Sequence, residues 1–117
     1  MVFQNRMKKA LKAGRVVFGP MVSEIRSPGI AVLFAQAGFD FFFIDMEHSC
    51  FSYETVSDMI MAARAADIPT IVRPSTRTSH ENLSRPLDSG AAGLLIPQIQ
   101  TRQDVENVVK WCRYQPV

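Results

Sequence analysis

Apolar and amphipathic segments alternate regularly along the chain. The apolar segments cover residues 16–22, 41–45, 69–75 and 92–98. Segments with the spacing of amphipathic helices follow them, at residues 28–38, 52–67, 79–90 and 101–114. Because the apolar segments are continuous rather than alternating, they predict strands of a parallel sheet that is covered on both faces. The amphipathic segments predict the helical crossovers of four βα units, so the fold class is α/β.

The predicted helices carry recognisable start and stop signals. Ser52 and Thr101 stand at N-cap positions, and Asp104 completes an acidic variant of the capping box. Gly38 stands at the expected C-terminal end of the first crossover helix. Pro86 lies deep inside the third crossover helix, where a proline costs about 3 kcal/mol or kinks the helix. We expect that helix to be broken or short.

The same pattern predicts how the chain is organised. A length of 117 residues favours one domain, 1–117, with a modest core. A further helix is predicted over about residues 4–13, before the first strand, and Gly14 ends it. From this rhythm alone, four βα units suit either an open flavodoxin-like sheet or one half of an eight-unit barrel.

Composition and charge favour an ordinary globular protein. The chain is 47% hydrophobic and 21% charged, with a net charge of +2. The densest basic cluster predicts a solvated helix face rather than a nucleic-acid contact, and consists of Arg6, Lys8, Lys9 and Lys12. No apolar run approaches the roughly 18 residues of a membrane span, and no apolar region follows the basic N-terminus as in a secretory signal. We therefore expect a cytoplasmic protein.

Several common site signatures are missing from the sequence. Cys50 and Cys112 lie far apart without CxxC spacing, which favours two free thiols over a zinc site and leaves a disulfide open. The sequence contains neither GxGxxG nor GxxxxGK[ST], the fingerprints of nucleotide binding, and it lacks the GxSxG elbow. A thiol nucleophile at Cys50, near His48, is a weaker alternative.

Polar side chains follow each apolar segment, where the strands of a parallel sheet would open onto a functional rim. In chain order these are Ser23, Glu24 and Arg26, then Asp45, Glu47 and His48, then Arg73 and Ser75, then Pro97 and Gln98. A histidine oriented by a carboxylate moves protons near neutral pH. An arginine offers a planar fork to a carboxylate or a developing enolate oxygen. The set predicts proton transfer beside an anionic carbonyl substrate.

Each of these residues also has a purely structural interpretation. Asp45 could cap the entry to the next helix, and His48 could be a loop histidine bonded to backbone. Arg73 could pair structurally with Asp45 or Glu47. The two carboxylates alone would under-fill a site for a hard cation. His80, in the first turn of the third crossover helix, is predicted to be a surface residue.

Three stretches in the same order resemble the HpcH/HpaI aldolase family, the class II pyruvate aldolases. They are AGFDFFFIDMEHSCFSYETV, IPTIVRPS and LDSGAAGLLIPQI, and the resemblance extends from about Gly19 to Tyr114. The Asp-x-Glu-His and Val-Arg-Pro-Ser elements after consecutive strands carry it. The resemblance implies a (β/α)8 TIM barrel, of which these four βα units would form the N-terminal half. It also implies a lyase that forms or cleaves a carbon–carbon bond between pyruvate and an aldehyde.

The resemblance also implies roles for individual residues. His48 matches the family's catalytic histidine and Asp45 the carboxylate that pairs with it. Arg73 matches the arginine that binds the pyruvate oxygens and steadies the enolate. Glu47 matches the motif's glutamate, placed near a metal-bound water. Asp88 matches an aspartate near the site in some members, often contributed across a subunit boundary, so a homo-oligomer is expected.

In this family a divalent metal, Mg, Mn or Co, holds the pyruvate enolate. Its ligands, a glutamate and an aspartate, come from the fifth and sixth strands, so this chain is expected to contribute no metal ligand. That expectation puts catalysis by the chain alone in doubt and leaves two alternatives open. One is a catalytically silent fragment that acts as an oligomerising or binding module. The other is the CoA-ester lyase chemistry of the wider superfamily, which the Asp-x-Glu-His motif disfavours.

Overall fold

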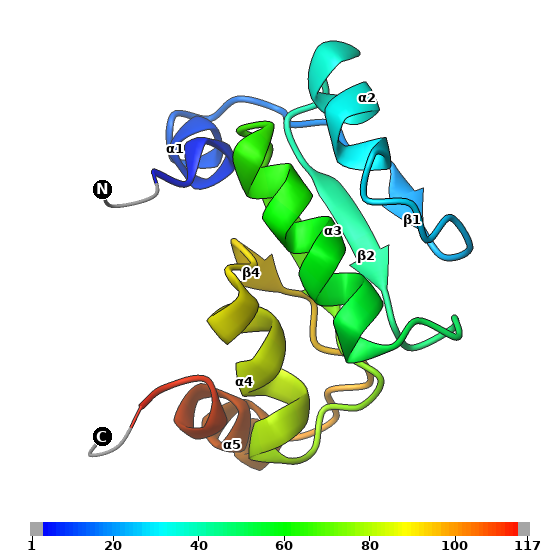
Figure 1. Cartoon of the computed structure of the whole chain (residues 1–117). Helices are drawn as coiled ribbons and strands as arrows, with labels where there is room; N and C mark the ends of the chain where they lie inside the picture. Colours follow the sequence, from blue (N-terminus) through cyan, green and yellow to red (C-terminus); the bar gives the residue numbers. More distant parts are fainter. Residues whose placement is uncertain (1–3, 115–117) are drawn as a thin grey trace.

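The computed structural model describes residues 4–114 and contains helices and strands in the predicted order (Figure 1). In chain order the elements are α1 (Arg6–Lys12), β1 (Met21–Val22), α2 (Ile30–Gln36), β2 (Phe42–Asp45), α3 (Tyr53–Ala65), β3 (Thr70–Arg73), α4 (His80–Ser89), β4 (Gly93–Leu94) and α5 (Arg102–Trp111). No helix in this part of the chain is long and apolar enough to cross a membrane.

The four strands form one parallel sheet in the order β1-β2-β3-β4, which confirms the predicted α/β class. In its centre Phe42 pairs with Thr70 and Ile44 with Val72. Each strand is followed by a helix, so sequential strands are neighbours joined by helical crossovers. This is the arrangement of successive units in a TIM barrel, and the sheet forms about half of one.

Helices α2, α3 and α4 lie together on one face of the sheet (Figure 1). Phe42, Ile44 and Val72 point to that face and are completely buried. Side chains alternate along a strand, so Phe43 and Ile71 point to the opposite face, where they are partly exposed. The predicted cover on both faces is therefore wrong. Continuous apolar strands arise here because the second face corresponds to the interior of a barrel.

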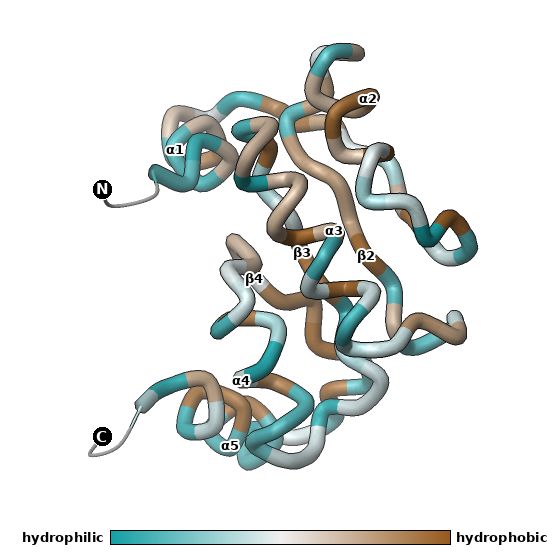
Figure 2. Tube along the Cα trace, viewed as in Figure 1, coloured by the Kyte–Doolittle hydropathy of each residue, from teal (hydrophilic) through white to brown (hydrophobic). Residues whose placement is uncertain are grey.

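Helix α3 matches its sequence prediction closely. Its N-cap Ser52 accepts a hydrogen bond from the backbone N–H of Thr55 at 3.1 Å. The buried residues of the helix are those predicted for its apolar stripe: Val56, Met59, Ile60 and Ala63. These pack with apolar residues of β2 and β3 in one hydrophobic core. Figure 2 colours the hydrophobic positions along the Cα trace brown.

The outer strands are shorter than the apolar segments that predicted them. Only Met21–Val22 of residues 16–22 and Gly93–Leu94 of residues 92–98 are strand. A proline interrupts each segment, and proline cannot donate a ladder hydrogen bond. Before β1 the chain also passes very close to its neighbour, since a Cβ at Gly19 would stand 2.3 Å from the carbonyl oxygen of Phe41.

The predicted break at Pro86 does not occur. Helix α4 runs through Pro86 and ends at Gly90, whose φ of 106° only glycine adopts readily. Pro86 lies in the last turn, so only one intrahelical hydrogen bond is lost. Its ring is completely buried, and its carbonyl accepts the N–H of Ala91 at 3.0 Å. Burial of the ring and this closing bond offset the lost hydrogen bond.

Helix α5 begins with the predicted capping box. Thr101 accepts the N–H of Asp104 at 3.2 Å, and Asp104 accepts the N–H of Thr101 at 2.9 Å. We expect Thr101→Ala to lower the free energy of unfolding by about 1 kcal/mol, because it removes the cap acceptor. Urea denaturation measures this effect. The matched variant Thr101→Ser keeps the hydroxyl and should remain near wild type, so equal losses in both variants would contradict a capping role.

Candidate active site

The carboxyl ends of the two central strands place a carboxylate beside a guanidinium. Asp45 and Arg73 are the last residues of β2 and β3 and are register partners. Arg73 donates two hydrogen bonds to Asp45, from Nε to Oδ1 at 2.9 Å and from Nη2 to Oδ2 at 2.7 Å. The Asp45 side chain is 1% exposed and that of Arg73 is 22% exposed. This is the planar bidentate geometry that makes arginine–carboxylate pairs strong.

Asp45 is held in its charged form by these neighbours. The hydrogen bond from Arg73 lowers the pKa of Asp45, opposed by burial and helped by the backbone N–H groups of Glu47 and His48. These N–H groups donate to Oδ1 at 2.9 and 3.4 Å. Asp45 in turn raises the pKa of Arg73. The pair therefore stays ionised and also fixes the turn that follows β2.

Glu47 connects the groups of this rim. Its Oε2 lies 3.3 Å from Arg73 Nε and 3.6 Å from His48 Nε2. Its Oε1 accepts a hydrogen bond from Gln98 Nε2 at 2.9 Å. The Glu47 side chain is only 9% exposed. One carboxylate thus contacts an arginine, a histidine and an amide from three different strand ends.

His48 projects from this cluster toward solvent, with its side chain 71% exposed. Within residues 4–114 no side-chain hydrogen bond joins it to Asp45, whose oxygens are engaged by Arg73 and by backbone N–H groups. The carboxylate nearest to its Nε2 is that of Glu47. The structure therefore brings the predicted His48, Arg73 and Asp45 together, but with Glu47 between the histidine and the arginine.

Gln98 was noted only as a strand-end residue, yet it holds Glu47 in place. It follows β4 and adopts a φ of 54°, one of few left-handed residues other than glycine in the described chain. This backbone conformation is uncommon for residues with a side chain and often occurs where a site demands it. In the sequence, the only sign that Gln98 would contact Glu47 was its position after a predicted strand.

The polar side chains that follow β1 form a group separate from the Asp45–Arg73 pair. They belong to Ser23, Glu24 and Arg26, and the Arg26 guanidinium lies 5.9 Å from the centre of the Phe51 ring. That geometry is a cation–π contact at the outer limit of the usual distance. No hydrogen bond among the described residues links these three side chains to Asp45 or Arg73.

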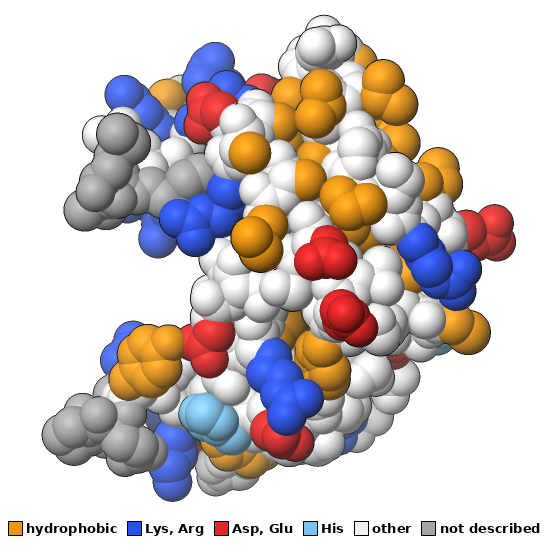
Figure 3. All heavy atoms as spheres, viewed as in Figure 1, with side chains coloured by type: hydrophobic (Ala, Val, Ile, Leu, Met, Phe, Trp, Pro, Cys, Tyr) orange, Lys and Arg blue, Asp and Glu red, His pale blue; other side chains and the backbone are white. Residues whose placement is uncertain are grey.

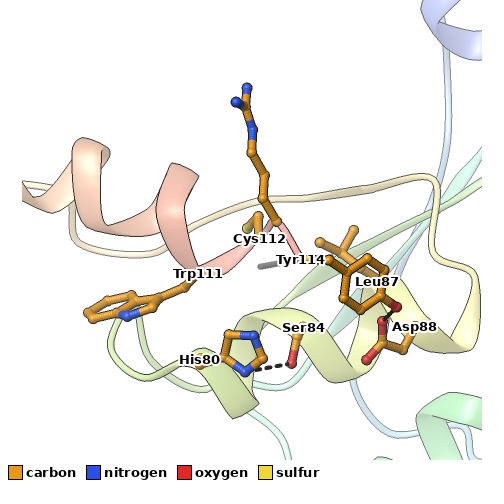
Figure 4. A pocket seen from close by; sticks show the side chains of 8 residues that line it. His80, Ser84, Leu87, Asp88, Trp111, Cys112 and Tyr114 are labelled. Carbon is orange, nitrogen blue, oxygen red and sulfur yellow. Dashed lines mark hydrogen bonds between the residues drawn. The ribbon is translucent and has the colours of Figure 1, made fainter. Parts of the chain in front are cut away.

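Asp88 and His80 line a different cavity, between α4 and α5 (Figure 4). Asp88 lies near the C-terminal end of α4, which is remote from the rim because a crossover helix runs antiparallel to its strand. The Tyr114 hydroxyl donates a hydrogen bond to Asp88, and His80 Nδ1 lies 3.3 Å from Ser84 Oγ. His80 is exposed, as predicted. The structure does not bring Asp88 to the rim of its own chain.

The two cysteines are free thiols, as predicted. Cys50 is exposed, and Cys112 is partly buried in the wall of the cavity between α4 and α5. Burial raises the pKa of the Cys112 thiol, which disfavours its thiolate form.

The rim does not offer a ligand set for a metal ion. Among residues 4–114, no group of three or more His, Cys, Asp or Glu side chains is placed to hold one. Both oxygens of Asp45 already accept hydrogen bonds from Arg73, and Glu47 is shared by Arg73 and Gln98. Two carboxylates used in this way leave a hard cation short of ligands.

Comparison with known proteins identifies relatives over nearly the whole chain. The chain is 32% identical over 112 residues to a hydroxypyruvate/pyruvate aldolase of Roseobacter denitrificans, covering 96% of this chain and 43% of the relative. It is 37% identical over 113 residues to a 4-hydroxy-2-oxo-heptane-1,7-dioate aldolase of Salmonella dublin, covering 97% of this chain and 42% of that relative. The crystal structure of an HpcH/HpaI aldolase from Desulfitobacterium hafniense superposes with a TM-score of 0.86 at 31% identity. The match covers 94% of this chain and 42% of that structure's chain.

The chain thus spans less than half the length of the curated relatives it matches. A family model described as HpcH/HpaI aldolase/citrate lyase matches residues 21–117, which include every strand and the whole rim. On this match the chain belongs to the HpcH/HpaI aldolase/citrate lyase family.

Proposed function

We propose that this chain provides the proton-transfer and oxyanion-binding half of a pyruvate aldolase site. The reaction would cleave a 4-hydroxy-2-oxo acid to pyruvate and an aldehyde. The observation that carries the proposal is the cluster in which Glu47 contacts both Arg73 and His48 at the carboxyl ends of the strands. A guanidinium for oxyanions and a histidine for protons, joined by one carboxylate, are the groups that this cleavage requires.

Arg73 is the proposed binding group for the 2-oxo acid. Its Nε and one Nη face Asp45 and Glu47. A guanidinium has five N–H groups, so further donors remain for a substrate carboxylate or enolate oxygen. Asp45 acts as a positioning residue, because it fixes the plane of the guanidinium through two hydrogen bonds. The substrate would then meet donors that are already oriented.

His48 is the proposed base. Its ring accepts the proton of the substrate hydroxyl, the bond between C3 and C4 breaks, and its electron pair moves into the pyruvate enolate while the aldehyde departs. Glu47, at 3.6 Å from Nε2, would orient the ring and stabilise the imidazolium that forms. This assigns to Glu47 part of the role that the resemblance implies for Asp45.

The family resemblance implies a divalent Mg, Mn or Co ion as cofactor. The described residues do not form a site for it, so no step of this mechanism is assigned to the metal. Asp88 lies at the end of α4 that is remote from the rim of its own chain. It would therefore belong to an active site only in an oligomer, where it would reach the rim of a neighbouring subunit. A homo-oligomer with pyruvate and an aldehyde as its small-molecule ligands is therefore part of the proposal.

Reconstitution tests the proposed function. The chain would be combined with the second half of the Desulfitobacterium hafniense relative in Mn²⁺ buffer, and pyruvate release from 4-hydroxy-2-oxo acids would be followed with a coupled dehydrogenase. We expect release only when both halves are present. A reconstituted, folded barrel that releases no pyruvate, under conditions in which the intact relative does, would contradict the proposal.

An oligomerising module is the second candidate, and one surface favours it. Hydrophobic side chains gather over α2 and the adjacent part of α3 (Figure 3). In this region Val32, Leu33 and Met61 are 45%, 62% and 63% exposed. Contiguous exposed apolar surface often marks a protein interface. A defined oligomer in sedimentation, together with no pyruvate release on reconstitution, would favour this candidate.

A further inference from the structure

An aromatic ring lies against the guanidinium of Arg73. The Arg73 Cζ lies over the ring of Phe43, 5.4 Å from its centre. A guanidinium within about 6 Å of a ring centre makes a cation–π contact. Phe43 thus contacts the proposed binding group for the 2-oxo acid, although it belongs to strand β2 and not to the loops of the rim.

The register of the central strands places this ring beside Arg73. Arg73 is the register partner of Asp45, and Phe43 precedes Asp45 by two residues on β2. Side chains alternate along a strand, so Phe43 and Asp45 point to the same face of the sheet, which is also the face of Arg73. Strand β2 has a neighbour on each side, where Phe43 pairs with Met21 and Ile71. The backbone of the sheet therefore fixes the position of the ring.

The ring restrains a motion that the hydrogen bonds to Asp45 leave open. Two parallel hydrogen bonds fix the edge of the guanidinium that faces the carboxylate. Hydrogen bonds at carboxylate oxygens have a broad angular distribution, so the guanidinium could still tilt out of the carboxylate plane. The Phe43 ring attracts the guanidinium from one side and opposes this tilt. The remaining N–H donors of Arg73 are then held in one direction, as binding of an oxyanion requires.

The surroundings of the ring separate this role from simple packing. Phe43 is partly exposed on the face that corresponds to the interior of a barrel, whereas Phe42 and Ile44 are completely buried in the core. Leucine at this position would supply apolar surface but no π-face for a cation. A packing role and a positioning role thus predict different effects of the same substitution.

We propose that Phe43 is a positioning residue for substrate binding, which orients Arg73 through the cation–π contact. Phe43 acts through the guanidinium rather than by touching the substrate. Another aromatic residue at this position preserves the contact, and an aliphatic residue loses it. This inference rests on the proposed function, because it takes Arg73 as the group that binds the 2-oxo acid.

Pyruvate titrations of the chain followed by ¹⁵N NMR test this role. We expect Phe43→Leu to weaken pyruvate binding about fivefold, which corresponds to about 1 kcal/mol, the usual size of a cation–π contact at a partly exposed site. Phe43→Tyr keeps the π-face and should bind pyruvate like wild type. Phe18→Leu is the matched control, because Phe18 is 68% exposed and precedes β1, at the opposite end of the sheet from the rim.

A double-mutant cycle shows whether Phe43 acts through Arg73. In an Arg73→Lys background, Phe43→Leu should cause no further loss of pyruvate affinity, because the planar fork that the ring orients is already absent. The NMR signal of the Arg73 Nε–H gives a second measurement, which does not depend on pyruvate. In wild type and Phe43→Tyr this proton should resonate upfield of its position in Phe43→Leu, because the guanidinium lies over an aromatic ring.

The outcomes separate this inference from the proposed function. Wild-type affinity in Phe43→Leu, with weaker binding in Arg73→Lys, would overturn the role of Phe43 and leave the function standing. Equal losses in Phe43→Leu and Phe43→Tyr, or a loss from Phe43→Leu that persists in the Arg73→Lys background, would also overturn it. A chain that does not bind pyruvate would count against the 2-oxo acid site at Arg73. The Arg73 signal would then decide alone, and an identical position in wild type and Phe43→Leu would overturn the contact.

Discussion

Substituting His48 by alanine is expected to lower the rate of pyruvate release by the reconstituted barrel about 10²–10⁴-fold, the usual contribution of a general base. The imidazole is the group on this rim best suited to accept a hydroxyl proton near neutral pH. It is 71% exposed and makes no side-chain hydrogen bond within the described residues, so its removal should leave stability almost unchanged. The effect should appear in kcat, measured at saturating substrate.

The second histidine offers a matched control. His80 is exposed on α4 in the wall of the cavity between α4 and α5, with its Nδ1 3.3 Å from Ser84 Oγ, so His80→Ala should retain wild-type activity. Glu47→Gln should cause a smaller loss than His48→Ala, because it removes the charge beside the ring but keeps a polar group there. Equal activity in wild type and His48→Ala would refute the role of this histidine as the base.

Replacing Arg73 by methionine is expected to destabilise the chain by about 3–5 kcal/mol. The change leaves Asp45, which is 1% exposed, as a buried carboxylate without its cationic partner. Urea denaturation at pH 7 measures the loss. The double variant Arg73→Met with Asp45→Asn removes the unpaired charge and should recover part of the stability. A wild-type midpoint for Arg73→Met would show that the ion pair contributes nothing to the fold.

The pair of Asp45 and Arg73 also predicts how the stability difference between wild type and Arg73→Met depends on pH. Arg73 lowers the pKa of Asp45 in the folded state relative to about 3.9 in an unfolded chain. The carboxylate therefore binds fewer protons in the folded state, and the stability it contributes is present above about pH 4 and falls as the pH drops through the folded pKa. The gap between wild type and Arg73→Met should shrink below pH 4. An unchanged gap between pH 7 and pH 3 would contradict this linkage.

The central βα units could be predicted from the sequence because local and global signals agree there. Phe42 to Ile44 form a continuous apolar run, and Ser52 caps a helix whose apolar stripe packs on that strand. Parallel strands open at one edge, so Asp45 and Arg73 could be placed together without a structure. Prediction succeeded where burial, capping and topology gave the same answer.

Other features depend on contacts that a sequence does not reveal. The start of β1 follows Pro20 and the close approach of Gly19 to Phe41. Helix α4 continues through Pro86 because tertiary packing buries its ring. The sequence does not reveal which carboxylate lies nearest the His48 ring: Arg73 engages Asp45, and Glu47 Oε2 lies 3.6 Å from His48 Nε2. Side-chain competition within one cluster decides such pairings.

The central claim is that this rim stabilises a pyruvate enolate. It is tested most directly by exchange of the pyruvate methyl protons in D₂O, followed by ¹H NMR with the reconstituted barrel and Mn²⁺. We predict exchange well above that of Mn²⁺ in buffer, and a loss of about 10²-fold or more in Arg73→Lys, whose ammonium keeps the charge but not the planar fork. Equal exchange by wild type and Arg73→Lys, or a wild-type rate no faster than buffer with Mn²⁺, would contradict the claim.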